Sequence, residues 1–162
     1  PSRDWMGGGE NVRAKDMVVM HQGPETYLSM MVLDGVFERY PNLRGASVEL
    51  GAGWVPEMLN RLDWVVRGWS KVDKNLSAIK RKPSEQLIQQ MAFTPFVFEN
   101  IGMLASQSSP ELYLFSSDYP HVEGGKDPIG RFEKSLGDHS ENVRNLFYTE
   151  NFLRIFPRAR VS

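Results

Sequence analysis

The chain has 162 residues and a formal net charge of −1, from 19 basic and 20 acidic side chains, so it lacks the strongly basic balance of a nucleic-acid-binding domain. It contains no cysteine, which excludes disulfides, Cys-ligated zinc and thiol catalysis and fits the reducing conditions of the cytoplasm. A chain of this length buries one core rather than two, so we expect residues 1–162 to form a single domain.

Apolar spacing predicts helices and strands in alternation. Helices with an apolar stripe, or with a proline in the first turn, are expected to begin near residues 24, 54, 84, 98, 127 and 140, and Pro41 ends the first of them. Short apolar strands are expected at 44–50, 91–94 and 112–115. Residues 71–83 are basic and polar and are predicted to be a solvated connection. No apolar run approaches the roughly 20 residues of a membrane span.

The alternation indicates an α/β fold with parallel strands in βα units. Parallel sheets have both faces covered, and three strands are few for such a sheet. We therefore expect these strands to be part of a larger sheet. Its open edge would be covered by segments of the chain itself or by a second copy.

The first candidate for chemistry is Asp118, which follows the predicted strand 112–115 in the sequence SSDYPH of residues 116–121. Ligands of α/β proteins bind at the carboxyl ends of the strands. A carboxylate at that place can ligate a metal or take a proton from water. The alternative is an aspartate that only caps a turn. His121, three residues later, can share the site of Asp118.

Two further residues are placed near a strand end. Glu49 lies inside the first predicted strand, where a buried acid is costly unless it is paired; the alternative is that it meets solvent or an arginine at the strand end. Trp54 directly follows the glycine-rich turn at residues 51–53 and is the tryptophan placed to face a strand-end site. Trp64 and Trp69 share its helix at a spacing typical of core residues.

The remaining histidines and glycines indicate less. The three histidines of the chain show no HxH or HExxH spacing, and therefore no recognisable metal motif. We expect His21 and His139 to be ordinary loop residues. The run Gly7-Gly8-Gly9 follows no predicted strand and lacks the spacing of a phosphate-binding loop, which indicates a flexible turn.

A family resemblance rests on three stretches, VFERYPNLR at 36–44, VELGAGWVP at 48–56 and LFSSDYPH at 114–121. Together they resemble the amidohydrolase-related family, in the branch that includes aminocarboxymuconate semialdehyde decarboxylase and related metal-dependent hydrolases. The resemblance extends over nearly the whole chain. It implies a (β/α)₈ TIM barrel of typically about 250 residues. This chain would supply the C-terminal part, and the complete enzyme would use one divalent metal, usually zinc.

The resemblance also implies roles for single residues. Asp118 matches the Asp of the eighth strand, which in the family ligates the metal and transfers a proton. Glu49 stands where the decarboxylases have a metal-binding His on the sixth strand. The HxH pair of the first strand has no counterpart, and the His of the fifth strand would precede Pro1. The implied site therefore has Asp118 as metal ligand, Asp118 and His121 as catalytic residues, and Glu49 and Trp54 as substrate-binding residues.

These observations predict a cytoplasmic metal-dependent hydrolase or non-oxidative decarboxylase of a small organic substrate, without a nucleic-acid or membrane partner. The chain would be the C-terminal half of the barrel and inactive alone. The alternative is a non-catalytic half-barrel that acts as a binding or assembly module, which the missing HxH pair favours. A third reading is a fragment of a longer chain, because the sequence opens at Pro1 rather than Met. A homo-oligomer is compatible with either half-barrel reading.

Overall fold

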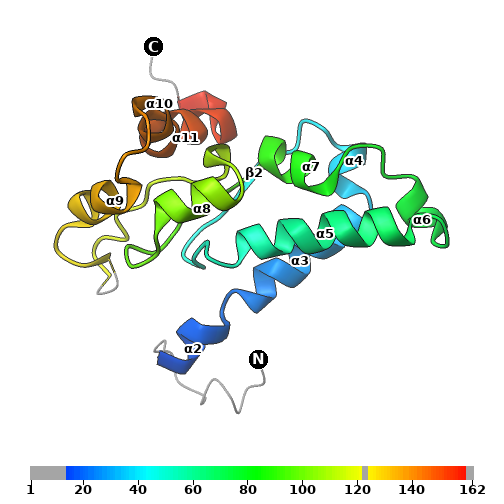
Figure 1. The fold of residues 1–162 in the computed structure, drawn as a ribbon, viewed down its shortest axis with the longest axis horizontal. Helices are drawn as coiled ribbons and strands as arrows, with labels where there is room; N and C mark the ends of the chain where they lie inside the picture. The colour runs from blue at the N-terminus through cyan, green and yellow to red at the C-terminus, as the bar shows by residue number, and fades with distance from the viewer. Residues whose placement is uncertain (1–13, 122–123, 160–162) are drawn as a thin grey trace.

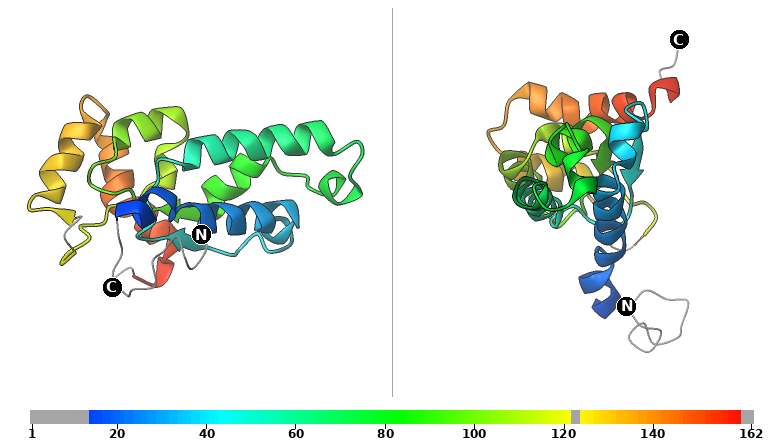
Figure 2. Two further views of the ribbon diagram at one scale, coloured as in Figure 1. Left: turned by 90° about the horizontal axis from the view of Figure 1, so that it is seen from below. Right: turned by 90° about the vertical axis from the view of Figure 1, so that its right-hand side faces the viewer.

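The computed structural model describes residues 14–121 and 124–159, so the turn expected at Gly7-Gly8-Gly9 lies outside the described residues (Figure 1). In chain order the elements are α2 (Ala14–Val19), α3 (Gln22–Leu33), α4 (Val36–Arg39), β1 (Gly45–Ser47), α5 (Val55–Trp69), α6 (Lys74–Ser77), α7 (Pro83–Gln90), β2 (Met91–Phe93), α8 (Ile101–Gln107), η1 (Pro110–Leu112), α9 (Pro128–Leu136), α10 (Glu141–Asn145), η3 (Leu146–Glu150), α11 (Asn151–Ile155) and η4 (Pro157–Ala159). Helices α3 to α7 gather toward one end of the long axis, and α8 and α9 lie toward the other (Figures 1 and 2).

The described residues contain one sheet, and it consists of β1 and β2 paired in parallel. Ala46 is opposite Ala92 in the register, so both strands run from the same end of the sheet. Parallel pairing of strands joined by helices is what the alternating sequence pattern predicts, and in this respect the α/β prediction is confirmed. Both strands are shorter than predicted, because β1 ends at Ser47 and β2 at Phe93.

The third predicted strand, at 112–115, is mostly not a strand. Residues Pro110–Leu112 form a turn of 3-10 helix, and only Tyr113 pairs with β2, through a parallel bridge to Phe93. The next two amides take different partners: Leu114 donates to the carbonyl oxygen of Phe93 at 2.9 Å and Phe115 donates to that of Phe147 at 3.0 Å. The segment therefore lies beside β2 like a third strand, but the C-terminal helices rather than another strand provide part of its hydrogen bonding.

Proline and side-chain caps start several of the helices, as the sequence predicts. Pro56 lies in the first turn of α5, and Pro83 and Pro128 begin α7 and α9. Asp127 caps α9 by accepting a hydrogen bond from the backbone amide of Gly130 at 2.9 Å. Asn100 caps α8 in the same way, through the amide of Met103.

Several boundaries predicted for helices are wrong. The helix expected between residue 24 and Pro41 is two helices, because Gly35 adopts a left-handed φ of 69° between α3 and α4. The solvated connection at 71–83 contains α6, which Asp73 caps. The last predicted helix is divided into α10, η3 and α11, with π-helical turns at Leu146–Glu150. Trp64 and Trp69 are 59% and 54% exposed, so their helical spacing does not place them in the core.

Side chains of β2 alternate between two apolar clusters, as the pleat of a strand requires. Met91 and Phe93 pack into the larger cluster together with buried residues of α3, α5, α7, α8 and α9. Ala92 points into the smaller cluster, which consists of Ala92, Leu114 and Ile155 with Ala46 packed against it. Helices therefore pack on one face of β2, and α11 contributes Ile155 to the other.

The N-terminal arm of the described chain extends away from this core. Figure 1 and the right-hand view of Figure 2 place α2 beyond the helices that pack on the sheet. None of the helices in residues 14–121 and 124–159 is both long enough and apolar enough to cross a bilayer.

Candidate metal centre

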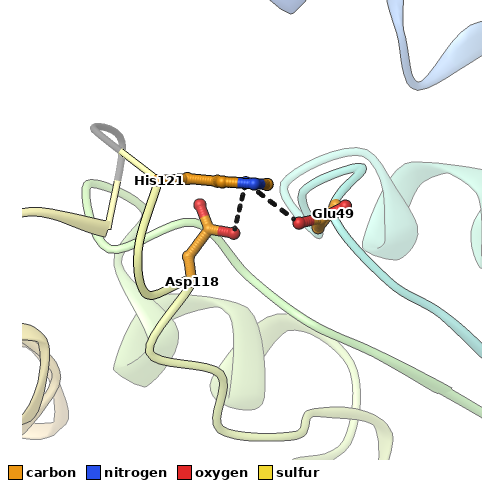
Figure 3. Close-up of side chains that lie close together, drawn as sticks. All are labelled: Glu49, Asp118 and His121. Carbon is orange, nitrogen blue, oxygen red and sulfur yellow. Dashed lines mark ion pairs between the residues drawn. The ribbon is translucent and has the colours of Figure 1, made fainter.

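Three titratable side chains meet where β1 and the segment beside β2 end (Figure 3). The Nδ1 atom of His121 lies 3.1 Å from Oε1 of Glu49 and 3.6 Å from Oδ1 of Asp118. Glu49 comes from the loop after β1, whereas Asp118 and His121 come from the loop after Phe115. Because both loops leave the carboxyl ends of parallel segments, they meet at one edge of the sheet.

The loop that carries Asp118 is held by local hydrogen bonds. Asp118 has a φ of 57°, its amide donates to Oγ of Ser116 at 3.3 Å, and its carbonyl oxygen accepts from the amide of His121 at 2.8 Å. The last bond closes a turn that places the carboxylate and the imidazole on the same side of the loop. The Asp118 side chain is only 10% exposed, whereas that of His121 is 53% exposed. The carboxylate is thus largely buried, and the imidazole is more than half exposed.

Glu49 lies outside the buried strand that the apolar spacing predicts for it. β1 ends two residues earlier, and Glu49 has a left-handed φ of 60°. Its backbone amide donates to Oγ1 of Thr94 at 3.1 Å instead of to a neighbouring strand. The side chain is 56% exposed and its partner is His121 rather than an arginine. The turn in the backbone is therefore what directs this carboxylate toward the other two groups.

A second acid, Glu99, holds the next part of the same loop. Its carboxylate accepts hydrogen bonds from the backbone amides of Ala52, Gly53 and Phe96, with shortest distances of 2.9, 2.7 and 2.7 Å. Glu99 belongs to the connection between β2 and α8, so one side chain joins two strand-end loops. Neither Thr94 nor Glu99 belongs to a local sequence motif, so the sequence alone does not identify them.

Trp54 lies at the start of α5, and its described contacts are structural. The indole N–H donates to the carbonyl oxygens of Leu50 and Gly51, and the ring packs edge-on against Phe93 at a centroid distance of 5.4 Å. His21 stacks on the same ring, with ring centroids 6.4 Å apart. The substrate-binding role of Trp54 stays a prediction, and His21 packs against a tryptophan rather than being a simple loop residue.

His139 is more than the ordinary loop residue that the sequence predicts. Its Nε2 atom lies 3.0 Å from the carbonyl oxygen of Gly102 and 3.4 Å from Oγ of Ser106, both on α8. The imidazole is half-buried between α8 and the end of α9. Gly102 allows this approach, because a Cβ atom at that position would lie 3.1 Å from the ring.

The donor atoms of the Glu49–Asp118–His121 group fit a divalent cation. One atom from each residue can be chosen so that all three lie within 4.8 Å of one another. Ligands bound at about 2.1 Å in a tetrahedral site lie roughly 3.4 Å apart. The 3.1 and 3.6 Å separations in the group bracket that value. One imidazole nitrogen and two carboxylate oxygens form a donor set typical of zinc and other first-row metals.

Comparisons with known proteins identify the fold and leave the family open. No protein-family model matches the sequence, and no curated protein matches it significantly. The structure is similar to the crystal structure of an amidohydrolase from Mycobacterium avium subsp. paratuberculosis, with a TM-score of 0.70 and 24% sequence identity. The match covers 91% of this chain and 37% of the amidohydrolase. This chain therefore folds like one part of an amidohydrolase and spans little more than a third of its length.

Proposed function

We propose that the chain forms part of a metal-dependent enzyme that hydrolyses or decarboxylates a small organic substrate. The observation that carries the proposal is the convergence of Glu49, Asp118 and His121 from two strand-end loops, at separations that suit a divalent cation. Such a cation supplies Lewis-acid chemistry, polarising a substrate carbonyl and making water easier to deprotonate.

The exposure of the three side chains suggests different tasks for them. The largely buried carboxylate of Asp118 can hold the metal and take a proton from water. His121 would supply the nitrogen ligand through Nδ1, so the proton that it can exchange with a substrate on the solvent side would be carried on Nε2. Glu49 supplies the second oxygen ligand, and Trp54 at the neighbouring helix start would contact the substrate.

The finer form of the proposal follows the family resemblance in the sequence. It places β1, β2 and the segment beside β2 in an eight-stranded barrel. The other strands of that barrel would come from polypeptide other than residues 1–162. The branch that contains aminocarboxymuconate semialdehyde decarboxylase makes decarboxylation the alternative to hydrolysis, and zinc the preferred metal. The amidohydrolase to which the structure is similar is consistent with the hydrolytic option.

Metal binding to the chain tests this proposal. Isothermal titration of the chelator-treated protein with zinc chloride, and separately with manganese chloride, is expected to give one bound ion per chain. Asp118→Asn should weaken binding by more than about tenfold, since changes around metal ligands already cost that much. The matched control is Asp138→Asn, an exposed carboxylate in another loop, and its affinity should equal that of the wild type. Absence of binding to the wild type, or equal affinity in Asp118→Asn, would contradict the proposal.

A second candidate is a non-catalytic binding or assembly module, and one observation favours it. Glu49 and His121 expose more than half of their side chains, whereas enzyme sites usually enclose the substrate. In this case the chain would form a homo-oligomer without metal. Sedimentation of the metal-free protein distinguishes the two candidates: a defined oligomer that takes up no zinc or manganese supports the module, and stoichiometric metal supports the enzyme.

A further inference from the structure

The carboxylate of Glu99 occupies a cradle of backbone amides in the loop that follows Glu49. Its Oε1 accepts from Gly53 at 2.7 Å and its Oε2 accepts from Ala52 at 2.9 Å. Oε2 also accepts from Phe96, in the loop of Glu99 itself, at 2.7 Å. Hydrogen bonds from amides to an ionised acceptor are stronger than neutral ones, so these contacts join the two loops firmly.

The glycines of this loop leave the room that the carboxylate needs. A Cβ atom on Gly53 would lie 2.8 Å from Oε1 of Glu99, closer than real contacts allow. Gly51 has a φ of 66°, and a Cβ there would lie 3.0 Å from the Phe96 ring and 3.2 Å from the same oxygen. The sequence Gly51-Ala52-Gly53 therefore provides a backbone shaped around the side chain of Glu99.

Two side chains that follow β2 hold the loop of Glu49 through backbone hydrogen bonds. Thr94 accepts the backbone amide of Glu49 itself, and Glu99 accepts the amides three and four residues later. Trp54 closes the loop internally through the carbonyl oxygens of Leu50 and Gly51. Because the Glu49 side chain is more than half exposed, these backbone ties rather than packing set where its carboxylate lies.

We propose that Glu99 is a positioning residue, which holds the loop of Glu49 so that its carboxylate stays beside His121 in the metal centre. The expected change in zinc affinity rests on the proposed function. The expected changes in hydrogen exchange and in the His121 resonances do not. Replacing a residue that orients a metal ligand without itself binding the metal typically changes metal affinity by about 10–100-fold. Glu99 would act in this way through the backbone of its neighbour, without touching the metal.

The test uses Glu99→Gln, which keeps the size of the side chain but replaces one acceptor oxygen with an NH₂ donor. At least one of the three backbone amides then loses its acceptor. We expect faster hydrogen exchange at Ala52 and Gly53, a shift of the His121 imidazole resonances in the metal-free protein, and zinc affinity lower by roughly tenfold. Glu85→Gln on α7 changes the same charge at an exposed position and is expected to alter none of these readouts.

Gly53→Ala provides a second variant, because its Cβ displaces the Glu99 carboxylate without changing any charge. It should reproduce the effects of Glu99→Gln, and it keeps the inference testable if Glu99→Gln fails to fold. Faster exchange at residues 52 and 53 with unchanged His121 resonances and unchanged zinc affinity would overturn the inference, since Glu99 would then only close a loop. A wild type that binds no metal would refute the proposed function, while the His121 resonances of the variants would still decide the role of Glu99.

Discussion

The backbone amide of Glu49 donates a hydrogen bond to the side-chain oxygen of Thr94, 45 residues later in the chain, at 3.1 Å. Thr94 in turn donates its own amide to the carbonyl oxygen of Ser47, at the end of β1. One buried threonine therefore continues the pairing of β1 and β2 for a residue beyond the strands and then ends it. At this point the backbone turns and the Glu49 side chain leaves the sheet toward His121.

Replacing Thr94 by valine should loosen this turn. Thr94→Val keeps the shape of the side chain but removes the acceptor for the amide of Glu49, so we expect the free energy of unfolding to fall by about 1–2 kcal/mol. Zinc affinity should fall by roughly tenfold, because Glu49 is then less well placed. Urea unfolding and calorimetric titration measure the two effects. Thr94→Ser keeps the hydroxyl and serves as the control; equal loss in both variants would assign the effect to packing instead.

The general arrangement of the fold could be predicted from the sequence because its signals are local. Prolines at the first turns of α5, α7 and α9, and the Asp127 cap, act within one turn of the chain. Strand ends depend on distant partners. Apolar spacing extends the first strand through Leu50, whereas the hydroxyl of Thr94 ends it before Glu49. Likewise, the pairing of Tyr113 with β2 is restricted to a single bridge, because the amide of Phe115 donates to Phe147 rather than to β2.

The candidate site was predictable in part. Asp118 and His121 are three residues apart after an apolar segment, which is enough to place them together. Glu49 could be associated with them only through the expectation that parallel strands end at one edge of the sheet. Thr94 and Glu99 could not be found in this way, because a side chain that accepts backbone amides from a loop over 40 residues away has no pattern in the sequence.

Gly124 tests how tightly the Asp118 loop is packed. A Cβ atom at this buried position would lie 2.4 Å from the backbone oxygen of Ser117 and 3.2 Å from Cβ of Asp118. Gly124→Ala must therefore displace the loop, with an expected loss of about 1–3 kcal/mol in the free energy of unfolding and weaker zinc binding. Gly23→Ala, where no atom lies within 4 Å of the added carbon, is the matched control. Wild-type zinc affinity in Gly124→Ala would show that Asp118 tolerates the shift.

Gly102 marks the close approach of α8 to the end of α9. A Cβ atom there would lie 2.3 Å from the backbone oxygen of Ser135 and 3.1 Å from the ring of His139. We expect Gly102→Ala to destabilise the protein by about 1–3 kcal/mol, since the two helices must separate. Gly68→Ala adds the same carbon in open space on α5 and should instead stabilise the protein by roughly 0.5–1 kcal/mol through helix propensity. Thermal unfolding of the two variants measures the expected loss and the expected gain in stability. A more stable Gly102→Ala would mean that α8 and the end of α9 are less closely packed than the structure shows.

Tyr113 should make the fold sensitive to alkaline pH. Burial raises the pKa of Tyr113 to about 12, and the charge of Glu99 adds to the rise while the hydrogen bond with Ser108 opposes it. In the unfolded chain the phenol titrates near 10. The unfolded state therefore loses this proton first, and the stability that Tyr113 contributes is complete below about pH 10 and is lost as the pH rises toward 12. The loss amounts to at most about 2.7 kcal/mol.

Tyr113→Phe separates this contribution from the other groups that titrate at high pH. At neutral pH the free energy of unfolding of the variant should be lower by about 1 kcal/mol, because the hydrogen bond between Tyr113 and Ser108 is lost. The hydroxyl of Ser108 keeps its bond to the carbonyl oxygen of Leu104. Its free energy of unfolding should then fall less steeply than that of the wild type between about pH 10 and 12. Burial also raises the pKa of Tyr148, so part of the alkaline loss will remain in the variant. Urea unfolding at a series of pH values gives both curves, and parallel curves would show that Tyr113 ionises as readily in the folded protein as in the unfolded chain.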